Sequence, residues 1–171
     1  MSNLILIIDF GSQYTQLIAR RVRESGVYSV VKSNNISKKE LFDLNPAGII
    51  LSGGPDSITL KKKNNLSKNI LNSNIPILGI CYGMQLITDF FKGKVKSSQK
   101  KEFGHAIFNI GKSSKLFYGL KKGKNLSVWM SHSDKVIQLP KGFESLGSSS
   151  NTKFAAMHNS EKKIYCLQFH P

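Results

Sequence analysis

Short apolar segments alternate with segments of helical periodicity through the first half of this chain. The apolar segments predict strands at residues 4–8, 27–31, 47–51 and 77–80. Apolar side chains recur at helical spacing over residues 14–22, and Gly26 is placed to cap that helix. Ser37 and Glu40 form a capping box for a short helix, which Pro46 must end. This alternation predicts an α/β fold with a doubly wound, mostly parallel sheet.

The second half of the chain is richer in strands. Residues 60–72 are polar and predicted to be helical, and residues 83–91 have helical spacing. After Gly93, further strands are expected near Val95 and at 106–110, 128–130, 154–157 and 164–170. Two polar segments, residues 103–105 and 131–134, are expected to be loops. The late strands should extend the sheet or form a small second layer, and residues 1–171 should form one domain, since no change of composition marks a boundary.

The composition is that of an ordinary globular protein, apart from its charge. Of the 171 residues 40% are hydrophobic, and no apolar run approaches the ~20 residues of a membrane-spanning helix. Residues 1–3 lead into the first strand without a basic leader, so we expect a cytoplasmic protein with no membrane partner. The formal charge of +15 raises nucleic acid as a partner. However, the lysines are scattered in short groups without interleaved aromatic residues, which indicates a solvated surface and no nucleic-acid partner.

Cys81 stands between a predicted strand and a predicted helix, with a glycine two positions away on either side. Gly79 and Gly83 leave room for a sharp, strained turn that would lift the thiol above the sheet, as in a Gly-x-Ser-x-Gly nucleophile elbow. At a helix N-terminus the free N–H groups and the helix dipole favour the thiolate, which is the form that attacks carbon. The alternative is a buried structural cysteine. Cys166 lies inside an apolar strand, so no disulfide is expected.

His170 stands at the carboxyl end of the last predicted strand, just before Pro171. A cysteine nucleophile needs a base, and a histidine far away in the sequence is the usual one. A lone histidine at a strand end is often structural. The carboxyl ends of parallel strands, however, share the edge at which α/β proteins bind ligands. The sequence therefore predicts that Cys81 and His170 meet at one edge of the sheet.

Two motifs around these residues resemble a known family. Residues 79–85 and 168–171 together resemble a triad-type class I glutamine amidotransferase domain. Three further segments resemble, more specifically, the amidotransferase part of GMP synthases: residues 9–24, 51–55 and 128–136. The resemblance implies a flavodoxin-like fold. It also implies hydrolysis of L-glutamine through a cysteine thioester, which supplies ammonia for the conversion of XMP to GMP in guanine nucleotide biosynthesis.

The resemblance assigns roles that the residues alone leave open. Cys81 would be the nucleophile and His170 the acid and base. Residues 52–56 lack the Gly-Lys-Ser/Thr ending of a phosphate-binding loop, and they form either a plain turn or, as in the family, a loop whose Gly54 amide serves the oxyanion hole. The Tyr82 amide would be the second oxyanion donor. The glutamine substrate would be contacted by Gln85, Gly53, Ser131 and His132.

The resemblance also bears on cofactors and partners. No metal or cofactor is expected in this domain. In the family a separate ATP-pyrophosphatase (synthetase) domain or subunit uses ATP and Mg²⁺, and the full-length ligase is expected to be a homodimer. The family places a glutamate that orients the histidine after its His-Pro pair, and a glycine where this chain has Ser133. Because the sequence stops at Pro171, we expect weak or no glutaminase activity with the pocket retained.

Other functions compete with this interpretation. The domain could serve another synthase, such as one making anthranilate or CTP, although residues 129–136 argue against that. It could also be a non-enzymatic flavodoxin-like protein with an oxidisable cysteine. Labelling of Cys81 by a glutamine-analogue electrophile would separate these classes, and steep salt dependence of DNA retention would reveal a nucleic-acid binder.

Overall fold

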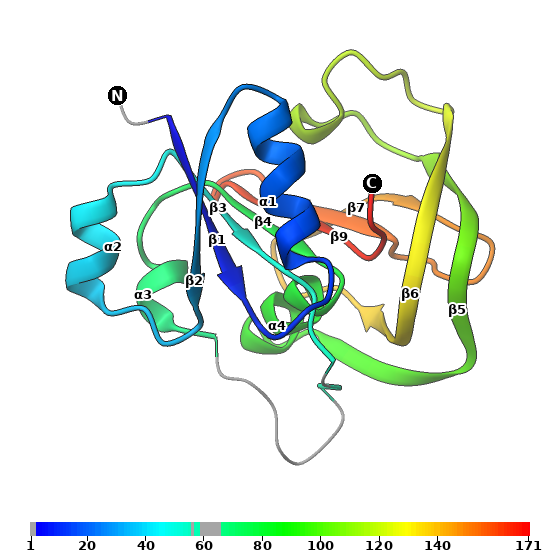
Figure 1. Cartoon of the computed structure of the whole chain (residues 1–171). Helices are drawn as coiled ribbons and strands as arrows, with labels where there is room; N and C mark the ends of the chain where they lie inside the picture. The colour runs from blue at the N-terminus through cyan, green and yellow to red at the C-terminus, as the bar shows by residue number, and fades with distance from the viewer. Residues whose placement is uncertain (1–2, 56, 59–65) are drawn as a thin grey trace.

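The computed structural model describes residues 3–55, 57–58 and 66–171, without the side chains of residues 99 and 100 (Figure 1). Its strands are β1 (Leu4–Asp9), β2 (Tyr28–Ser33), β3 (Gly48–Leu51), β4 (Ile77–Ile80), β5 (Lys94–Ile110), β6 (Asn125–Gln138), β7 (Glu144–Ser148), β8 (Ala156–Asn159) and β9 (Ile164–Leu167). Its helices are α1 (Thr15–Glu24), α2 (Lys38–Leu44), α3 (Lys68–Leu71) and α4 (Tyr82–Phe90), with a 3-10 turn at Lys115–Phe117. The strands form one sheet in the order β2-β1-β3-β4-β9-β8-β7-β5-β6.

The first five strands of that order are parallel, as the sequence predicts. β1 pairs with β2 and β3, β3 with β4, and β4 with β9, all in parallel register. Leu6, Ile7 and Ile8 of β1 are fully buried, because a central parallel strand has both faces covered. The carboxyl ends of β1, β3, β4 and β9 consequently meet at one edge, which is where the chemistry was expected.

The helix boundaries follow local capping signals. Ser37 and Glu40 form the predicted capping box of α2, and Asn45 ends this helix in a left-handed conformation before Pro46. α1 ends at Glu24, Ser25 caps it, and Gly26 follows with φ +79°. Of the helix predicted over residues 60–72, only α3 lies within the described residues; residues 60–65 lie outside them. No helix of the described residues is long and apolar enough to cross a membrane.

The β-rich second half extends the sheet and then curves back on itself (Figure 1). β8 is antiparallel to β9 and β7, and β5 is antiparallel to β7 and β6. The backbones of Trp129 in β6 and His170 just after β9 then exchange two hydrogen bonds, of 3.1 and 2.8 Å. These pairings close a ring of strands. A second core fills it, formed by Phe108, Ile110, Phe117, Val128, Met130, Leu146, Ala155, Ala156, Leu167 and Phe169.

Two of the predicted loops and several strand boundaries are wrong. Residues 103–105 lie inside β5 and residues 131–134 inside β6, where Phe103 pairs with Ser131 across the hairpin. The pairing partner, nearly thirty residues away, keeps these polar segments extended. β7 was not predicted, since its Gly147 and serines are weak strand formers. The strand predicted at 154–157 is β8, which begins two residues later. The strand predicted at 164–170 is β9, which ends at Leu167, so that His170 lies just beyond the strand and not at its last position.

Candidate active site

Cys81 lies on a strained turn between β4 and α4, as predicted. Its backbone has φ 53° and ψ −107°, a conformation that L-residues rarely adopt and that turns the side chain away from the strand. The glycines on either side are required by close packing. A Cβ on Gly79 would lie 2.7 Å from Ile87 Cδ1, and one on Gly83 would lie 2.5 Å from the Leu51 carbonyl oxygen. The turn is therefore held against β3 and against its own helix.

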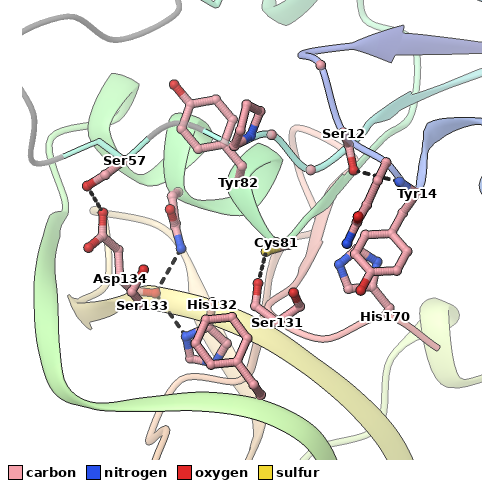
Figure 2. Close-up of a pocket in the computed structure, with 17 residues that line it drawn as sticks. Ser12, Tyr14, Ser57, Cys81, Tyr82, Ser131, His132, Ser133, Asp134 and His170 are labelled. Atoms are coloured by element: carbon pink, nitrogen blue, oxygen red, sulfur yellow. Dashed lines mark hydrogen bonds between the residues drawn. The ribbon is translucent and has the colours of Figure 1, made fainter.

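The Cys81 turn opens onto a cavity of about 470 Å³, which is large enough for a small substrate (Figure 2). The cavity brings together the carboxyl ends of the parallel strands, the loop after β1 and the middle of β6. It is lined by every residue that the sequence predicts for the site, namely Gly53, Gly54, Cys81, Tyr82, Gln85, Ser131, His132 and His170. The predicted meeting of Cys81 and His170 at one edge of the sheet is confirmed.

The Cys81 thiol is held in its neutral form. It is 7% exposed, and its Sγ–H donates to the Ser131 carbonyl oxygen at 3.4 Å (Figure 2). Burial raises the pKa of the thiol to about 11, which outweighs the opposite effects of the Tyr82 N–H and the Gln168 amide. The expected preference for thiolate at the helix N-terminus is thus wrong for this structure. Desolvation of the sulfur is the larger effect.

His170 is positioned by its backbone and by an aromatic neighbour. Its ring lies against that of Tyr14, with 4.2 Å between ring centroids (Figure 2). Burial, assisted by the nearby His132, lowers the pKa of His170 to about 4, so the imidazole is neutral at pH 7. No hydrogen bond joins Cys81 to His170 within the described residues. The two groups therefore share the cavity as a thiol and a neutral imidazole, which has an unprotonated ring nitrogen.

The glycine loop after β3 lies beside the Cys81 turn. A Cβ on Gly54 would be 2.9 Å from the Tyr82 ring and 3.1 Å from the Phe10 carbonyl oxygen, so only glycine fits. Among the described residues, no acceptor is bonded to the Gly54 N–H. An amide without an acceptor at a cavity wall is suited to binding an anionic oxygen. Asp56, which ends the predicted loop, lies outside the described residues.

The side chains of Gln85 and His132, both predicted to contact the substrate, make hydrogen bonds within the protein. Gln85 Nε2 donates to the Asp134 carbonyl oxygen at 2.8 Å, and His132 Nδ1 lies 3.0 Å from the same oxygen. His132 Nε2 lies 3.1 Å from Glu102 Oε2, close enough for an ion pair but without hydrogen-bond geometry. Burial lowers the pKa of His132, against the opposing effect of Glu102. This buried network fixes β6 where it forms the cavity wall.

Glu102 itself was not predicted. It is 8% exposed and faces inward where the register of β5 against β6 shifts between Ser97 and Glu102. Its carboxylate accepts hydrogen bonds from the hydroxyls of Ser149 and Thr152. Such an irregularity re-aims a side chain, and the sequence carries no local signal for it.

Ser12 and Tyr14 also line the cavity and were not assigned a role. Their loop is ordered by Asp9, whose carboxylate accepts from the backbone N–H groups of Gly11 and Ser12 and from the Thr15 hydroxyl. Ser12 Oγ in turn accepts from the Tyr14 N–H at 3.0 Å. A polar loop at the carboxyl end of a central parallel strand was a usable signal for both residues.

Comparison with known proteins agrees with this geometry. A family model described as glutamine amidotransferase class-I matches residues 6–171. The GMP synthase (glutamine-hydrolyzing) of Staphylococcus saprophyticus is 52% identical over 168 residues, which are 98% of this chain and 32% of that protein. The corresponding protein of Maridesulfovibrio salexigens is 48% identical over 169 residues, covering 99% of this chain and 33% of that protein. The chain thus spans about a third of the length of these relatives.

Solved structures resemble the whole described fold. A protein from Thermoplasma acidophilum, described as a candidate GMP synthase subunit, superposes with a TM-score of 0.80 at 32% identity, covering 98% of this chain and 83% of that one. A glutamine amidotransferase from Thermotoga maritima gives a TM-score of 0.76 at 21% identity, covering 98% of this chain and 75% of that one, a likeness of fold alone. The expected flavodoxin-like α/β fold is confirmed. Together with the family model, these likenesses show that the chain belongs to the class I glutamine amidotransferase family.

Proposed function

We propose that this domain hydrolyses the side-chain amide of L-glutamine, as the glutaminase part of a GMP synthase. The main support is the position of Cys81, on a strained turn that opens into a cavity shared with His170 and the Gly54 loop. The names of the relatives support the choice of synthase. Because the chain spans about a third of their length, the synthesis of GMP would need a partner domain or subunit that consumes the ammonia together with ATP.

The reaction begins with proton transfer from the Cys81 thiol to the neutral imidazole of His170. The sulfur then attacks the amide carbon of glutamine, and the amide oxygen becomes an oxyanion that accepts from the Gly54 and Tyr82 N–H groups. The imidazolium returns its proton to the amide nitrogen as the carbon–nitrogen bond breaks and ammonia leaves. A thioester between Cys81 and the glutamyl group remains.

Water completes the cycle. His170, now neutral again, takes a proton from a water molecule that attacks the thioester carbon. The carbon–sulfur bond breaks, the proton returns to the sulfur, and glutamate is released. Loss of one oxyanion donor would raise the barrier by about 2.7–4 kcal/mol, which gives each amide a measurable share of the rate.

The neutral state of both groups matters for this mechanism. A thiol whose pKa is raised to about 11 by burial and an imidazole whose pKa is lowered to about 4 do not exchange a proton at rest. In the resting site the thiol donates to the Ser131 carbonyl instead. We infer that glutamine binding turns the thiol from Ser131 toward His170, so that the nucleophile forms only when substrate is present.

Labelling with an electrophilic glutamine analogue tests the proposed function directly. A diazoketone analogue of glutamine should alkylate Cys81, and L-glutamine should slow the labelling, whereas L-asparagine at the same concentration should not. A Cys81→Ser variant should take up no label, and the Cys166→Ala variant should label like the parent, since Cys166 is fully buried. Labelling that glutamine does not slow, or labelling of the Cys81→Ser variant at the parental rate, would contradict the proposal.

A further inference from the structure

Gln168 is a fully buried polar residue whose side chain the mechanism above does not use. It follows β9 directly and is 0% exposed, between the buried Leu167 and Phe169. Its backbone N–H donates to the Ala155 carbonyl oxygen at 2.8 Å. Its side-chain Nε2 lies 3.8 Å from the Cys81 sulfur, and its Oε1 has no hydrogen-bond partner within the described residues.

Packing alone does not account for a glutamine at this position. A buried carbonyl oxygen without a donor destabilises the folded state, and such atoms are rare in native proteins. A methionine of similar length would fill the same space without an unpaired oxygen. The contact with sulfur is the feature that an apolar residue could not supply.

The sulfur changes its hydrogen-bonding role during the proposed reaction. At rest it is a donor to Ser131, but once its proton leaves it becomes an anion that needs donors. The N–H of Tyr82 and the amide of Gln168 are the two groups that favour the anion. Since the Tyr82 N–H is assigned to the substrate oxygen, the Gln168 amide is the donor that can stay on the sulfur.

We propose that Gln168 is a catalytic residue that donates a hydrogen bond from Nε2 to the Cys81 sulfur and stabilises the thiolate as it forms. The role of Gln168 in glutamine hydrolysis rests on the proposed function. The effect of Gln168 on the Cys81 sulfur does not. The geometry is rigid, because the Cys81 N–H donates to the Leu167 carbonyl oxygen at 2.7 Å. The backbone that carries the amide and the backbone that carries the sulfur are therefore bonded directly to each other.

The rate of Cys81 alkylation by iodoacetamide, measured against pH in the Gln168→Met variant, tests this. Mass spectrometry of the peptide that contains Cys81 separates it from the buried Cys166. Loss of the donor should slow alkylation near pH 8 about tenfold, which corresponds to a rise of about one unit in the pKa of the thiol. The melting temperature should not fall, because the unpaired oxygen is removed as well. A Tyr165→Phe variant, altered on β9 away from the sulfur, should keep the parental rate of alkylation.

A second variant, Gln168→Glu, tests the same proposal independently of Gln168→Met. Gln168→Glu replaces the donor with an acceptor at neutral pH, and it should slow alkylation at least as much as Gln168→Met. An unchanged or faster rate of alkylation near pH 8 in both variants would overturn the proposal and leave Gln168 as a space-filling residue. If the glutamine analogue fails to label the parent while both variants still react more slowly with iodoacetamide, the proposed function fails and the action of Gln168 on sulfur stands.

Discussion

Replacing Gly83 with alanine would press a methyl group into the strand that lies beneath the Cys81 turn. The new Cβ would be 2.5 Å from the carbonyl oxygen of Leu51 and 2.8 Å from its Cβ. Ordinary contact begins near 3.4 Å, so about 0.9 Å (3.4 minus 2.5) must be made up by movement. Leu51 is fully buried in β3, which is paired with β1 on one side and β4 on the other. The helix must therefore move, and the Cys81 turn with it.

The expected loss of stability follows from two opposing effects. Overpacking of a close-packed site costs about 1–3 kcal/mol, and occasionally more. Alanine in place of glycine within a helix returns about 0.5–1 kcal/mol. A net loss of about 1 kcal/mol lowers the melting temperature of a chain of this size by roughly 2–4 °C. The displacement of the turn should also slow alkylation of Cys81.

Thermal unfolding followed by far-UV circular dichroism, with alkylation of Cys81 as a second readout, measures both effects. Gly111→Ala is the control, because its Cβ would meet nothing closer than 3.5 Å and its backbone is not left-handed. That variant should melt within about 1 °C of the parent, which corresponds to a surface substitution of small effect. If Gly83→Ala melts and reacts like Gly111→Ala, the turn is not held by contact with β3, and our account of its glycines is wrong.

The other two predictions concern the buried network and the pH dependence of stability. Glu102→Ala should lose about 1–3 kcal/mol in urea unfolding, since it leaves the hydroxyls of Ser149 and Thr152 without their acceptor. Glu102→Gln should lose less, because its amide oxygen can still accept from Thr152 and its amide N–H can donate to the neutral ring of His132. Equal losses would mean that the carboxylate is not specifically paired. The pKa of His170 is lowered to about 4 from an ordinary value near 6.5, so the unfolded chain binds the proton first as pH falls. Stability from the neutral imidazole is present above pH 6.5 and is lost as the pH falls toward 4. A His170→Gln variant should lose less stability than the parent over that range, and an identical pH dependence would show that His170 does not titrate in this way.

Local signals in the sequence were sufficient for the parallel half of the fold. Continuous apolar runs marked strands buried on both faces, and the Ser37–Glu40 capping box and Pro46 marked the ends of α2. The antiparallel half was predicted less well. Residues 103–105 pair with residues 129–131, and His132 and Asp134 pair with Glu102 and Ser97. These polar segments are extended because of partners about thirty residues away, and no window of local sequence contains both partners.

The sequence also predicted that Cys81 and His170 belong to one site. A Gly-x-Cys-x-Gly turn and a histidine at a strand end are short motifs, and the predicted fold places both at one edge of the sheet. The protonation state of the site was not predicted correctly. A local rule about helix N-termini predicted a thiolate at Cys81, but burial by residues far away in the chain raises its pKa instead. The contact of Gln168 with Cys81 spans 87 residues, and the pairing of Glu102 with His132 depends on a shift of strand register. Protonation and long-range contacts depend on desolvation and on which strands become neighbours, and those quantities exist only once the chain is folded.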